Sequence, residues 1–370
     1  MRIGITCYPT FGGSGVIATE LGKFLARKGH EIHFISSAVP FRLQKFNGQI
    51  FFHEVEVVTY PLFEHQPYAL NLAAKLSEVI SYQKLDILHA HYAIPHSISA
   101  YLAKQITQHP VKIVTTLHGT DITVVGNDPA FLPITRFGIE QSDGVTAVSR
   151  YLKDQTLIEF NTTRQLEVIY NFIDTNEFSR REQKELREKF APDGEMILIH
   201  ISNFRPVKRV DFTIEVFSKI LDKFPAKFIL IGDGPERGKA EQKCRELSIC
   251  EHTFFMGKQS NINDYLSIAD LLICASETES FGMSVLEAIS CGVPVIASNV
   301  GGIPEIISHG SEGFLVDKAD LQGFTDAGIE ILHNPELQRK MRSAGIDRAR
   351  KYFDAGIIIP QYESFYRSLL

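Results

Sequence analysis

The sequence of 370 residues has few cysteines, a small net charge and no long apolar run. Its five cysteines are odd in number and form no C-x-x-C pair, which argues against a disulfide framework or a zinc site. The net charge of -6 argues against a nucleic-acid-binding protein, whose surface usually carries clustered basic residues. No apolar run approaches the roughly 18 to 20 residues that span a bilayer, and the first predicted strand begins at Arg2. We therefore expect a cytoplasmic protein without a signal peptide or a membrane segment.

The opening segment GITCYPTFGGSG, residues 4–15, lacks the pattern of a dinucleotide-binding loop. That pattern is G-x-G-x-x-G between a strand and a helix, with an acidic residue at the end of the second strand. Here Gly12, Gly13 and Gly15 are clustered, and the second strand, EIHFISS, ends in serines. The clustered glycines are therefore not a degraded dinucleotide fingerprint.

Short β-rich runs alternate with helical patterns along the chain, which predicts right-handed β-α-β units and parallel sheets. The predicted strands are residues 2–8, 31–37, 51–59, 85–91, 112–118, 143–149 and 166–170, then 196–202, 227–232, 252–257, 270–275, 294–298 and 313–317. Because the chain exceeds the size of one core, we expect two α/β domains, 1–172 and 173–352, joined near residues 171–178. The tail, 353–370, is a helical pattern with a predicted break at Pro360. It could pack on either half, including back on the first domain.

The densest group of functional residues is predicted in residues 275–307, which follow a buried strand. Open parallel sheets bind ligands at the carboxyl ends of their strands. Glu279 precedes a helix and Glu287 lies two turns inside it, which separates the two carboxylates by about 10 to 12 Å. A glycosidase pair needs about 5 to 9.5 Å, so this spacing better suits two carboxylates that bind hydroxyls on separate sugar rings. Taken singly, each glutamate could be an ordinary solvated residue. The start of the helix also offers unpaired N–H groups for an anion, at Gly282, Met283 and Ser284.

The Glu-x7-Glu pair, followed by CGVPVIAS and GGIPE, resembles the signature of the retaining GT-B glycosyltransferases of family 4. The resemblance implies an α/β fold of two doubly wound Rossmann-like domains that face each other across a cleft. It places the acceptor on the N-terminal domain and the nucleotide sugar on the C-terminal domain. It implies that Glu279 is a catalytic residue beside the reacting carbon and that Glu287 binds the nucleotide ribose. It implies no metal ion and no cofactor.

The segment ISNFRPVKRVD, residues 201–211, supplies two further catalytic candidates. Arg205 and Lys208 lie where family members place an arginine and a lysine on the donor diphosphate, and two cations match two phosphate charges. The family's arginine usually stands at the position of Ser202 or Asn203, so Arg205 is a substitute. A solvated helix start is the alternative for this basic cluster. The donor contacts that the resemblance implies are Gly13, Ser14, Asn203, Gly234, Lys258, Phe281, Gly282, Met283, Ser284 and Glu287.

Two predicted strands of the first half end in histidines, in HAHYAIPH and TTLHGTD. His89 and His91 lie two residues apart and share one face of a strand. No third ligand has motif spacing, so the sequence favours buried core histidines over a metal site. By resemblance, His118 is a catalytic residue that approaches the donor sugar near its anomeric carbon. A histidine bonded to loop backbone is the alternative.

The first-half motifs are most similar to those of family members that transfer N-acetylglucosamine from UDP-N-acetylglucosamine to L-malate, the first step of bacillithiol biosynthesis. Relatives with an anionic inositol phosphate acceptor use a tyrosine, a threonine and an arginine, and these match Tyr92, Thr116 and Arg136. An ion pair with Glu140 is the alternative for Arg136. Arg42 is a further acceptor candidate. The bare backbone of Gly12, Gly13 and Ser14 could approach both the donor phosphate and malate.

No first-half motif supplies an obvious carboxylate nucleophile for a double displacement. The resemblance therefore implies front-face substitution, in which the leaving diphosphate oxygen helps take the malate proton while cations and the helix N-terminus hold the growing charge. Two alternatives stay open: a family 4 transferase with another small anionic acceptor, and a UDP-sugar-binding or epimerising GT-B protein. A homodimer is expected only from the resemblance.

Overall fold

The computed structural model describes residues 1–10, 12–43, 48–56 and 66–370, and the last residues of the third predicted strand, 57–59, lie outside this part. The chain divides into two compact units. Unit 1 contains Met1–Phe172 together with Ala355–Leu370, and unit 2 contains Ile173–Asp354. Within the described residues, no helix is both long enough and apolar enough to cross a bilayer.

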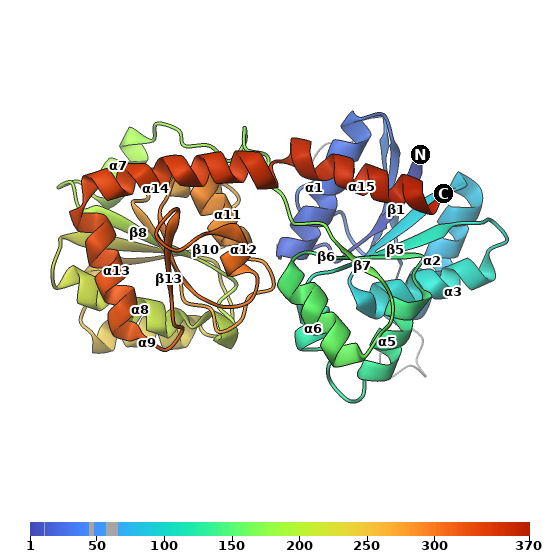
Figure 1. Ribbon diagram of the computed structural model, residues 1–370, viewed down its shortest axis with the longest axis horizontal. Helices are drawn as coiled ribbons and strands as arrows, with labels where there is room; N and C mark the ends of the chain where they lie inside the picture. The colour runs from blue at the N-terminus through green and yellow to red at the C-terminus, as the bar shows by residue number, and fades with distance from the viewer. Residues whose placement is uncertain (11, 44–47, 57–65) are drawn as a thin grey trace. The chain divides into compact units, whose positions relative to one another are not determined.

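The described part of unit 1 is built on a seven-stranded parallel sheet in the order β3-β2-β1-β4-β5-β6-β7 (Figure 1). Its strands are β1 (Arg2–Thr6), β2 (Glu31–Ser36), β3 (Ile50–Glu54), β4 (Ile87–His91), β5 (Lys112–Leu117), β6 (Gly144–Ala147) and β7 (Leu166–Val168). Its helices are α1 (Gly13–Arg27), α2 (Tyr68–Gln83), α3 (Ile98–Ile106), α4 (Thr120–Thr123), α5 (Leu132–Gln141), α6 (Arg150–Phe160) and α15 (Ala355–Leu369).

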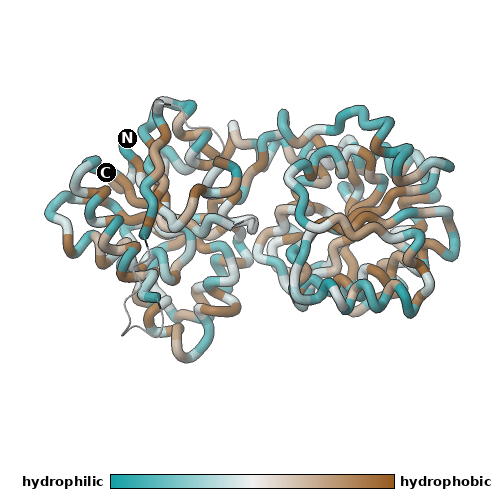
Figure 2. Tube along the Cα trace, turned by 180° about the vertical axis from the view of Figure 1, so that it is seen from behind, coloured by the Kyte–Doolittle hydropathy of each residue, from teal (hydrophilic) through white to brown (hydrophobic). Residues whose placement is uncertain are grey.

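The strands of unit 1 are apolar runs because helices cover both faces of the sheet. Every residue of β4 is buried, including its two histidines. Helix α1 presents the fully buried side chains of Ile17, Leu21 and Leu25 at intervals of four residues, which gives it one apolar face. In Figure 2 the hydrophobic colour is concentrated in the interior of unit 2, the unit without the labelled termini.

Unit 2 repeats the same design with a six-stranded parallel sheet in the order β10-β9-β8-β11-β12-β13. Its strands are β8 (Met196–Ile201), β9 (Ala226–Ile231), β10 (Thr253–Gly257), β11 (Leu271–Cys274), β12 (Val295–Ser298) and β13 (Gly313–Val316). Its helices are α7 (Lys184–Phe190), α8 (Val210–Leu221), α9 (Arg237–Glu246), α10 (Ile262–Ile268), α11 (Met283–Ser290), α12 (Ile303–Ile306), α13 (Leu321–His333) and α14 (Pro335–Arg348). All predicted strand positions are confirmed in the described residues.

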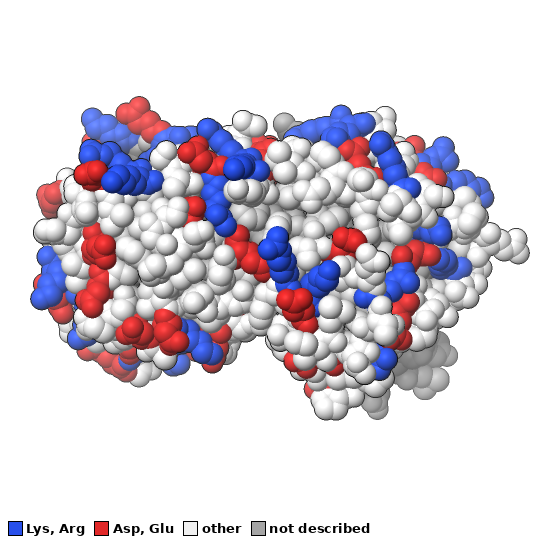
Figure 3. Space-filling model, in the orientation of Figure 1, with Lys and Arg blue, Asp and Glu red and all other residues white. Residues whose placement is uncertain are grey.

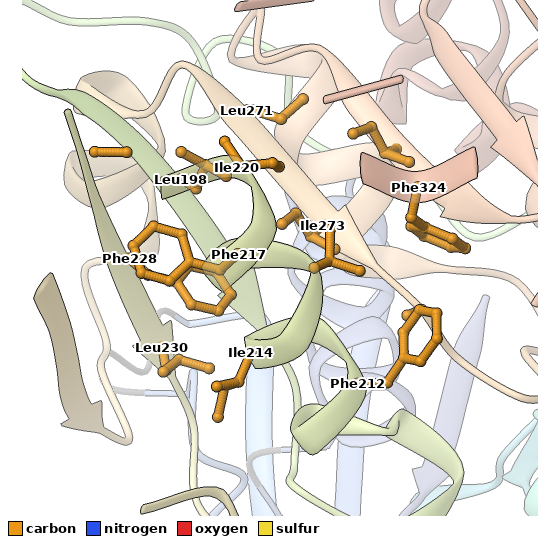
Figure 4. Close-up of a cluster of buried hydrophobic side chains, with 14 of the residues drawn as sticks. Leu198, Phe212, Ile214, Phe217, Ile220, Phe228, Leu230, Leu271, Ile273 and Phe324 are labelled. Atoms are coloured by element: carbon orange, nitrogen blue, oxygen red, sulfur yellow. The ribbon is translucent and has the colours of Figure 1, made fainter. Parts of the chain in front are cut away.

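The core of unit 2 packs α8 and α13 against the sheet (Figure 4). Phe217 of α8 stacks on Phe228 of β9 with 4.9 Å between ring centroids, and Phe212 meets Phe324 of α13 edge-on at 5.4 Å. Each such buried ring contributes about 1.5–3 kcal/mol by removal from water. This packing fixes the central strands β8 and β11, whose carboxyl ends carry predicted donor residues.

Both sheets are doubly wound, as predicted. The chain moves outward from β1 to β3 and then returns to the other side of β1 with β4, and β8 to β11 repeat this reversal. Open sheets of this kind bind ligands at the reversal point, outside the carboxyl ends of the two central strands. The loops after β1, β4, β8 and β11 are therefore the places to look for a site.

The C-terminal helix α15 belongs to unit 1. Its Glu363 forms an ion pair with Lys28 and lies 2.9 Å from His30 Nε2. Phe365 of the helix packs so closely over Gly144 of β6 that a Cβ there would lie 2.7 Å from the ring. The end of the chain thus completes the N-terminal unit.

The predicted break of the tail at Pro360 is wrong. Helix α15 continues from Ala355 to Leu369 with Pro360 inside it. A proline in a helix removes one backbone hydrogen bond, at a cost of roughly 3 kcal/mol. The buried side chains of Ile358, Ile359 and Tyr362 on the same helix supply apolar burial that offsets this cost.

Charged side chains of both signs are interspersed on the face that Figure 3 shows, without a large area of one sign. This distribution fits the small net charge of -6.

Candidate active site

Lys208 and Glu279 form an ion pair at the reversal point of unit 2. Lys208 ends a short turn, Pro206–Lys208, that follows β8, and Glu279 lies in the loop after β11. Their side chains are only 21% and 16% exposed. Burial lowers the pKa of Lys208, but the neighbouring Glu279 and Cys274 outweigh burial, and the pKa is raised above its usual value. The ammonium group is therefore held charged at the place predicted for the donor diphosphate.

The second glycine turn, GGIPE, positions the loop that carries Glu279. Gly302 N–H donates to the Glu279 carbonyl oxygen at 2.9 Å. A Cβ on Gly301 would lie 1.8 Å from the same oxygen, and Gly301 has a φ of +58°. Both features require glycine at position 301. The sequence identified this turn only as part of the family signature, whereas the structure shows what it supports.

The N-terminus of α11 is open for a ligand. Gly282 precedes the helix in a left-handed conformation and, as a glycine, has no side chain to cap the N–H groups of the first turn, which begins at Met283 and Ser284. Glu287 is buried within the helix, with 7% of its surface exposed. The ring of Phe281 is buried and packs edge-on against Phe353 at 5.9 Å, so only its backbone is placed for the predicted donor contact.

The other predicted donor residues of unit 2 lie on two surface turns. Asn203, Arg205 and Lys258 are exposed. Gly234 packs against the turn after β8, where an added Cβ would lie 2.1 Å from the Asn203 carbonyl oxygen. The structure thus joins Asn203 and Gly234 in one packed turn, and Arg205 lies just before the turn that holds Lys208.

In unit 1, Asp121 joins the loops that follow β4 and β5. Its carboxylate accepts hydrogen bonds from the backbone N–H groups of Ala93 at 2.9 Å, Gly119 at 2.8 Å and His118 at 3.1 Å. Burial raises the pKa of Asp121 to about 6, although these three bonds favour the charged form. Asp121 is a positioning residue that sequence reasoning missed. The available signal was its place as the last residue of HGTD, directly after a strand.

Tyr92 and Ser14 are in direct contact. Ser14 Oγ donates a hydrogen bond to the Tyr92 hydroxyl at 3.2 Å, which joins the start of α1 to the loop after β4. Tyr92 has a φ of +97°, an uncommon conformation for a residue other than glycine. Ser14, predicted to contact the donor, and Tyr92, predicted to contact the acceptor, thus lie together. The hydrogen bond from Ala93 N–H to Asp121 helps to hold the strained backbone at Tyr92.

The opening glycines serve different purposes. A Cβ on Gly15 would lie 2.6 Å from the Tyr8 carbonyl oxygen, so packing requires glycine there. Among the residues that the structure describes, a Cβ on Gly12 would meet nothing closer than Thr10 Oγ1 at 3.5 Å, and the φ of Gly12 is -75°. Neither packing nor conformation requires glycine at position 12. Gly13 begins helix α1 directly after it.

Thr116 does not present its hydroxyl to the surface, in contrast to its predicted acceptor contact. The side chain is fully buried, with its Oγ1 2.6 Å from His89 Nε2 and 2.7 Å from Thr146 Oγ1. His89 Nδ1 lies 2.7 Å from the hydroxyl of Tyr366 on α15. The inward direction follows from the position of Thr116 in β5, where it faces His89 on the neighbouring strand β4.

His91 and His118 share a hydrogen bond of 2.9 Å between Nδ1 and Nε2. His91 is fully buried, and its ring lies 4.2 Å from that of His89. Burial lowers the pKa of His89 and of His118 to about 3 and lowers that of His91 well below its usual value, so all three are neutral near pH 7. In the part of the chain that the structure describes, no three or more His, Cys, Asp or Glu residues are arranged to hold a metal ion.

Arg136 is engaged on the surface of α5. Its Nε lies 2.8 Å from Glu140 Oε1, and the two side chains are 44% and 37% exposed. The structure thus shows the ion pair that the sequence left open as the alternative. Such an exposed pair is worth only about 0.3–0.5 kcal/mol, so an anionic ligand could replace Glu140. Arg42 is more buried, and its Nη1 lies 4.0 Å from Glu20 Oε1.

Two doubly wound units with polar loops at the carboxyl ends of their central strands define the GT-B architecture, and the chain belongs to the glycosyltransferases of family 4. Residues 11–177 match the family described as Glycosyltransferase Family 4, and residues 182–348 match Glycosyl transferases group 1.

Among individual relatives, N-acetyl-alpha-D-glucosaminyl L-malate synthase of Bacillus anthracis is 49% identical over 371 residues, which cover 100% of this chain and 97% of the relative. D-inositol 3-phosphate glycosyltransferase of Mycolicibacterium smegmatis is 26% identical over 266 residues, which cover 67% of this chain and 59% of that protein. The crystal structure of Anabaena Alr3699/HepE in complex with UDP and glucose superimposes with a TM-score of 0.86 over 100% of both chains. Its sequence identity of 20% limits this likeness to the fold.

Proposed function

We propose that this protein is a retaining glycosyltransferase that moves N-acetylglucosamine from UDP-N-acetylglucosamine to the hydroxyl of L-malate, the first step of bacillithiol biosynthesis. The observation that carries the proposal is the 49% identity, over the entire chain, to the Bacillus anthracis enzyme of that name. The ion pair of Lys208 with Glu279 and the contact of Ser14 with Tyr92 support it locally, because both lie at strand ends that such substrates require.

The donor binds unit 2 in this proposal. Lys208 and Arg205 hold the diphosphate together with the open N-terminus of α11, whose dipole favours negative charge. Without the donor, Glu279 neutralises Lys208. The diphosphate takes over this role and frees the Glu279 carboxylate for the sugar beside its reacting carbon. Lys208 remains paired throughout, so its buried charge is never left uncompensated. The remaining contacts are Glu287 to the ribose, and Asn203, Gly234, Lys258, Phe281, Gly282, Met283 and Ser284 along the donor.

The acceptor binds the loops of unit 1 in this proposal. L-malate carries two carboxylates, which need cations and hydroxyl or N–H donors. Tyr92 and Arg136 supply such groups, and Arg136 gives up its weak contact with Glu140. The open backbone at Gly12, next to Gly13 and Ser14, lets a substrate approach the N-terminus of α1. Thr116 supports the acceptor site through its buried hydrogen bonds with His89 and Thr146. Arg42 is a further cation for the acceptor.

The reaction proposed is a front-face substitution. The malate hydroxyl oxygen forms a bond to the anomeric carbon on the side from which UDP departs. The bond between that carbon and the diphosphate oxygen breaks, and the malate proton passes to this oxygen. The protein contributes positioning and electrostatic stabilisation, with Lys208, Arg205 and the α11 N-terminus holding the charge that develops on UDP. Glu279 and His118 lie against the sugar.

The test is UDP release from UDP-N-acetylglucosamine with separate acceptors: L-malate, D-malate, L-lactate and an inositol phosphate. We expect release with L-malate, and a product that proton NMR identifies as the α-anomer. Release with the inositol phosphate and none with L-malate would contradict the proposed acceptor.

The engagement of Arg136 and Thr116 within unit 1 favours keeping a second candidate, a family 4 transferase with another small anionic acceptor. The same acceptor panel distinguishes the two. An epimerising GT-B protein would convert UDP-N-acetylglucosamine without any acceptor. We further propose a homodimer, which analytical ultracentrifugation tests, and a cytoplasmic location, where nucleotide-sugar donors are made.

A further inference from the structure

The hydrogen bond between His91 and His118 raises the question of which ring donates. His91 Nδ1 lies 2.9 Å from His118 Nε2, and the planes of the two rings are within 25° of parallel, with centroids 5.1 Å apart. Both rings are neutral near pH 7 because burial lowers their pKa values. Each ring then carries one proton, on one of its two nitrogens. The shared hydrogen belongs either to His91 or to His118.

The second nitrogen of His91 distinguishes the two arrangements. His91 Nε2 is buried and has no hydrogen-bond partner within the described residues. If His118 donated the shared bond, His91 would carry its proton on Nε2, as a buried N–H group without an acceptor. Buried N–H groups without an acceptor are uncommon in folded proteins, because the lost hydrogen bond to water is not replaced. If His91 donates from Nδ1, its Nε2 carries no proton, and no N–H group of the buried His91 ring is left unpaired.

We propose that His91 is a positioning residue that donates from Nδ1 and thereby holds His118 as the Nδ1–H tautomer. His118 then has an N–H donor at Nδ1 and no lone pair there, so it can donate to a ligand oxygen but cannot act as a base at that atom. The role for ligand binding rests on the proposed function, whereas the tautomer itself does not.

The surroundings of His118 suit a fixed donor. Its backbone N–H is anchored on Asp121, and its ring lies 5.3 Å from that of Tyr92. The side chain is half-buried, and among the described residues Nδ1 has no hydrogen-bond partner. The Nδ1–H group is therefore available for an oxygen of the sugar or of the acceptor.

The tautomer is measured on the full-length protein labelled with 15N-histidine, by long-range 15N–1H correlation NMR. His118 is assigned by the signals that disappear in His118→Gln. We expect the wild-type signal of an imidazole protonated at Nδ1, although free histidine favours Nε2–H. His91→Asn keeps an N–H donor near the Nδ1 position and should retain this signal. His91→Leu removes the donor, and His118 should return to Nε2–H.

Kinetics add a second readout. His91→Leu should lower kcat/KM by about tenfold or more, the size of effect seen when the partner that orients a metal-binding histidine is lost, and His91→Asn should restore most of this activity. An Nε2–H signal in the wild type, or an unchanged tautomer in His91→Leu, would overturn the inference whatever the activity. If the tautomer is as expected and L-malate is not a substrate, the proposed function fails and the assignment of His91 stands.

Discussion

Lys208 and Glu279 neutralise each other across the ends of two neighbouring strands, although the proposed donor needs them for different groups. In this pair each side chain compensates the other's charge in a largely buried site. Donor binding must replace the contact between Lys208 and Glu279 with contacts from each residue to the donor. Variants of the two residues should therefore behave differently.

Glu279→Gln should separate binding from turnover. The amide removes the negative charge that competes with the diphosphate for Lys208, so the affinity for UDP should equal or exceed that of the wild type. Turnover should fall by about tenfold or more, because a charge placed for the transition state is lost. Calorimetry and a UDP-release assay measure the two effects. Glu277→Gln is the matched control, since Glu277 lies in the same loop and its side chain pairs with exposed Lys318. Weaker UDP binding in Glu279→Gln would contradict the exchange of partners.

Lys208→Met should weaken UDP binding by about tenfold or more, or roughly 1.4 kcal/mol, because it removes a charged phosphate contact from a mostly buried place. Lys318→Met, at the exposed lysine that pairs with Glu277 of the site loop, should leave the affinity unchanged. Isothermal calorimetry with UDP gives both values. Equal affinities for Lys208→Met and wild type would remove Lys208 from the phosphate site.

Arg136 and Glu140 should act in opposite directions on the acceptor. Arg136→Ala should raise the KM for L-malate while sparing UDP affinity. Glu140→Gln releases Arg136 from its surface ion pair and should leave that KM unchanged or lower it by up to about twofold, in line with the small energy of the pair. Initial rates at varied malate concentration provide the measurement. A rise in the UDP dissociation constant with normal malate KM would mean that the acceptor is misplaced.

Gly12→Ala and Gly15→Ala distinguish a glycine needed for ligand approach from one needed for packing. Gly15→Ala should lower the melting temperature, because its Cβ would lie 2.6 Å from the Tyr8 carbonyl oxygen. Gly12→Ala meets no such obstacle, so its free energy of unfolding should stay within about 0.5 kcal/mol of the wild-type value. Its KM values for the substrates should rise. Thermal unfolding and steady-state kinetics test the pair. Wild-type kinetics in Gly12→Ala would leave this loop as a simple turn.

Unit 1 should lose stability in mild acid. Burial lowers the pKa of His89 and His118 to about 3 and that of His96 to about 4, whereas in the unfolded chain they titrate near 6.5. Their contribution is fully present above pH 6.5 and is lost as the pH falls toward these folded values. Asp121, whose pKa burial raises to about 6, acts in the opposite direction: its contribution is present below pH 3.8 and lost as the pH rises through 6.

Three histidines outweigh one aspartate, so the free energy of unfolding should fall between pH 6.5 and pH 4.5, by about 1.4 kcal/mol per pH unit for each net proton. Urea unfolding at a series of pH values, followed by circular dichroism, measures the slope. Constant stability across this range would show that these histidines titrate normally in the fold.

The candidate site was predictable where function depends on local motifs. Glu279, Lys208 and the open helix start at Gly282 follow strands directly, so their loops could be placed from sequence. The partners of these residues could not be predicted from the sequence, because they come from other loops. The turn at Gly301 supports Glu279, Asp121 joins the loops after β4 and β5, and Thr116 points inward to His89. Each of these contacts depends on the spacing of neighbouring strands, which no local pattern contains.

The sequence by itself determined the strands and the alternation with helices, because a strand covered on both faces must be a short apolar run wherever it occurs. Only the tertiary structure decided that the tail, residues 353–370, contains one continuous helix, Ala355–Leu369, and which unit it packs on. Helix α15 passes through Pro360 and completes unit 1 because Glu363 meets Lys28 and His30 and because Phe365 covers Gly144. Those contacts join the last helix to segments more than 200 residues earlier in the sequence, and their burial offsets a local preference to break the helix.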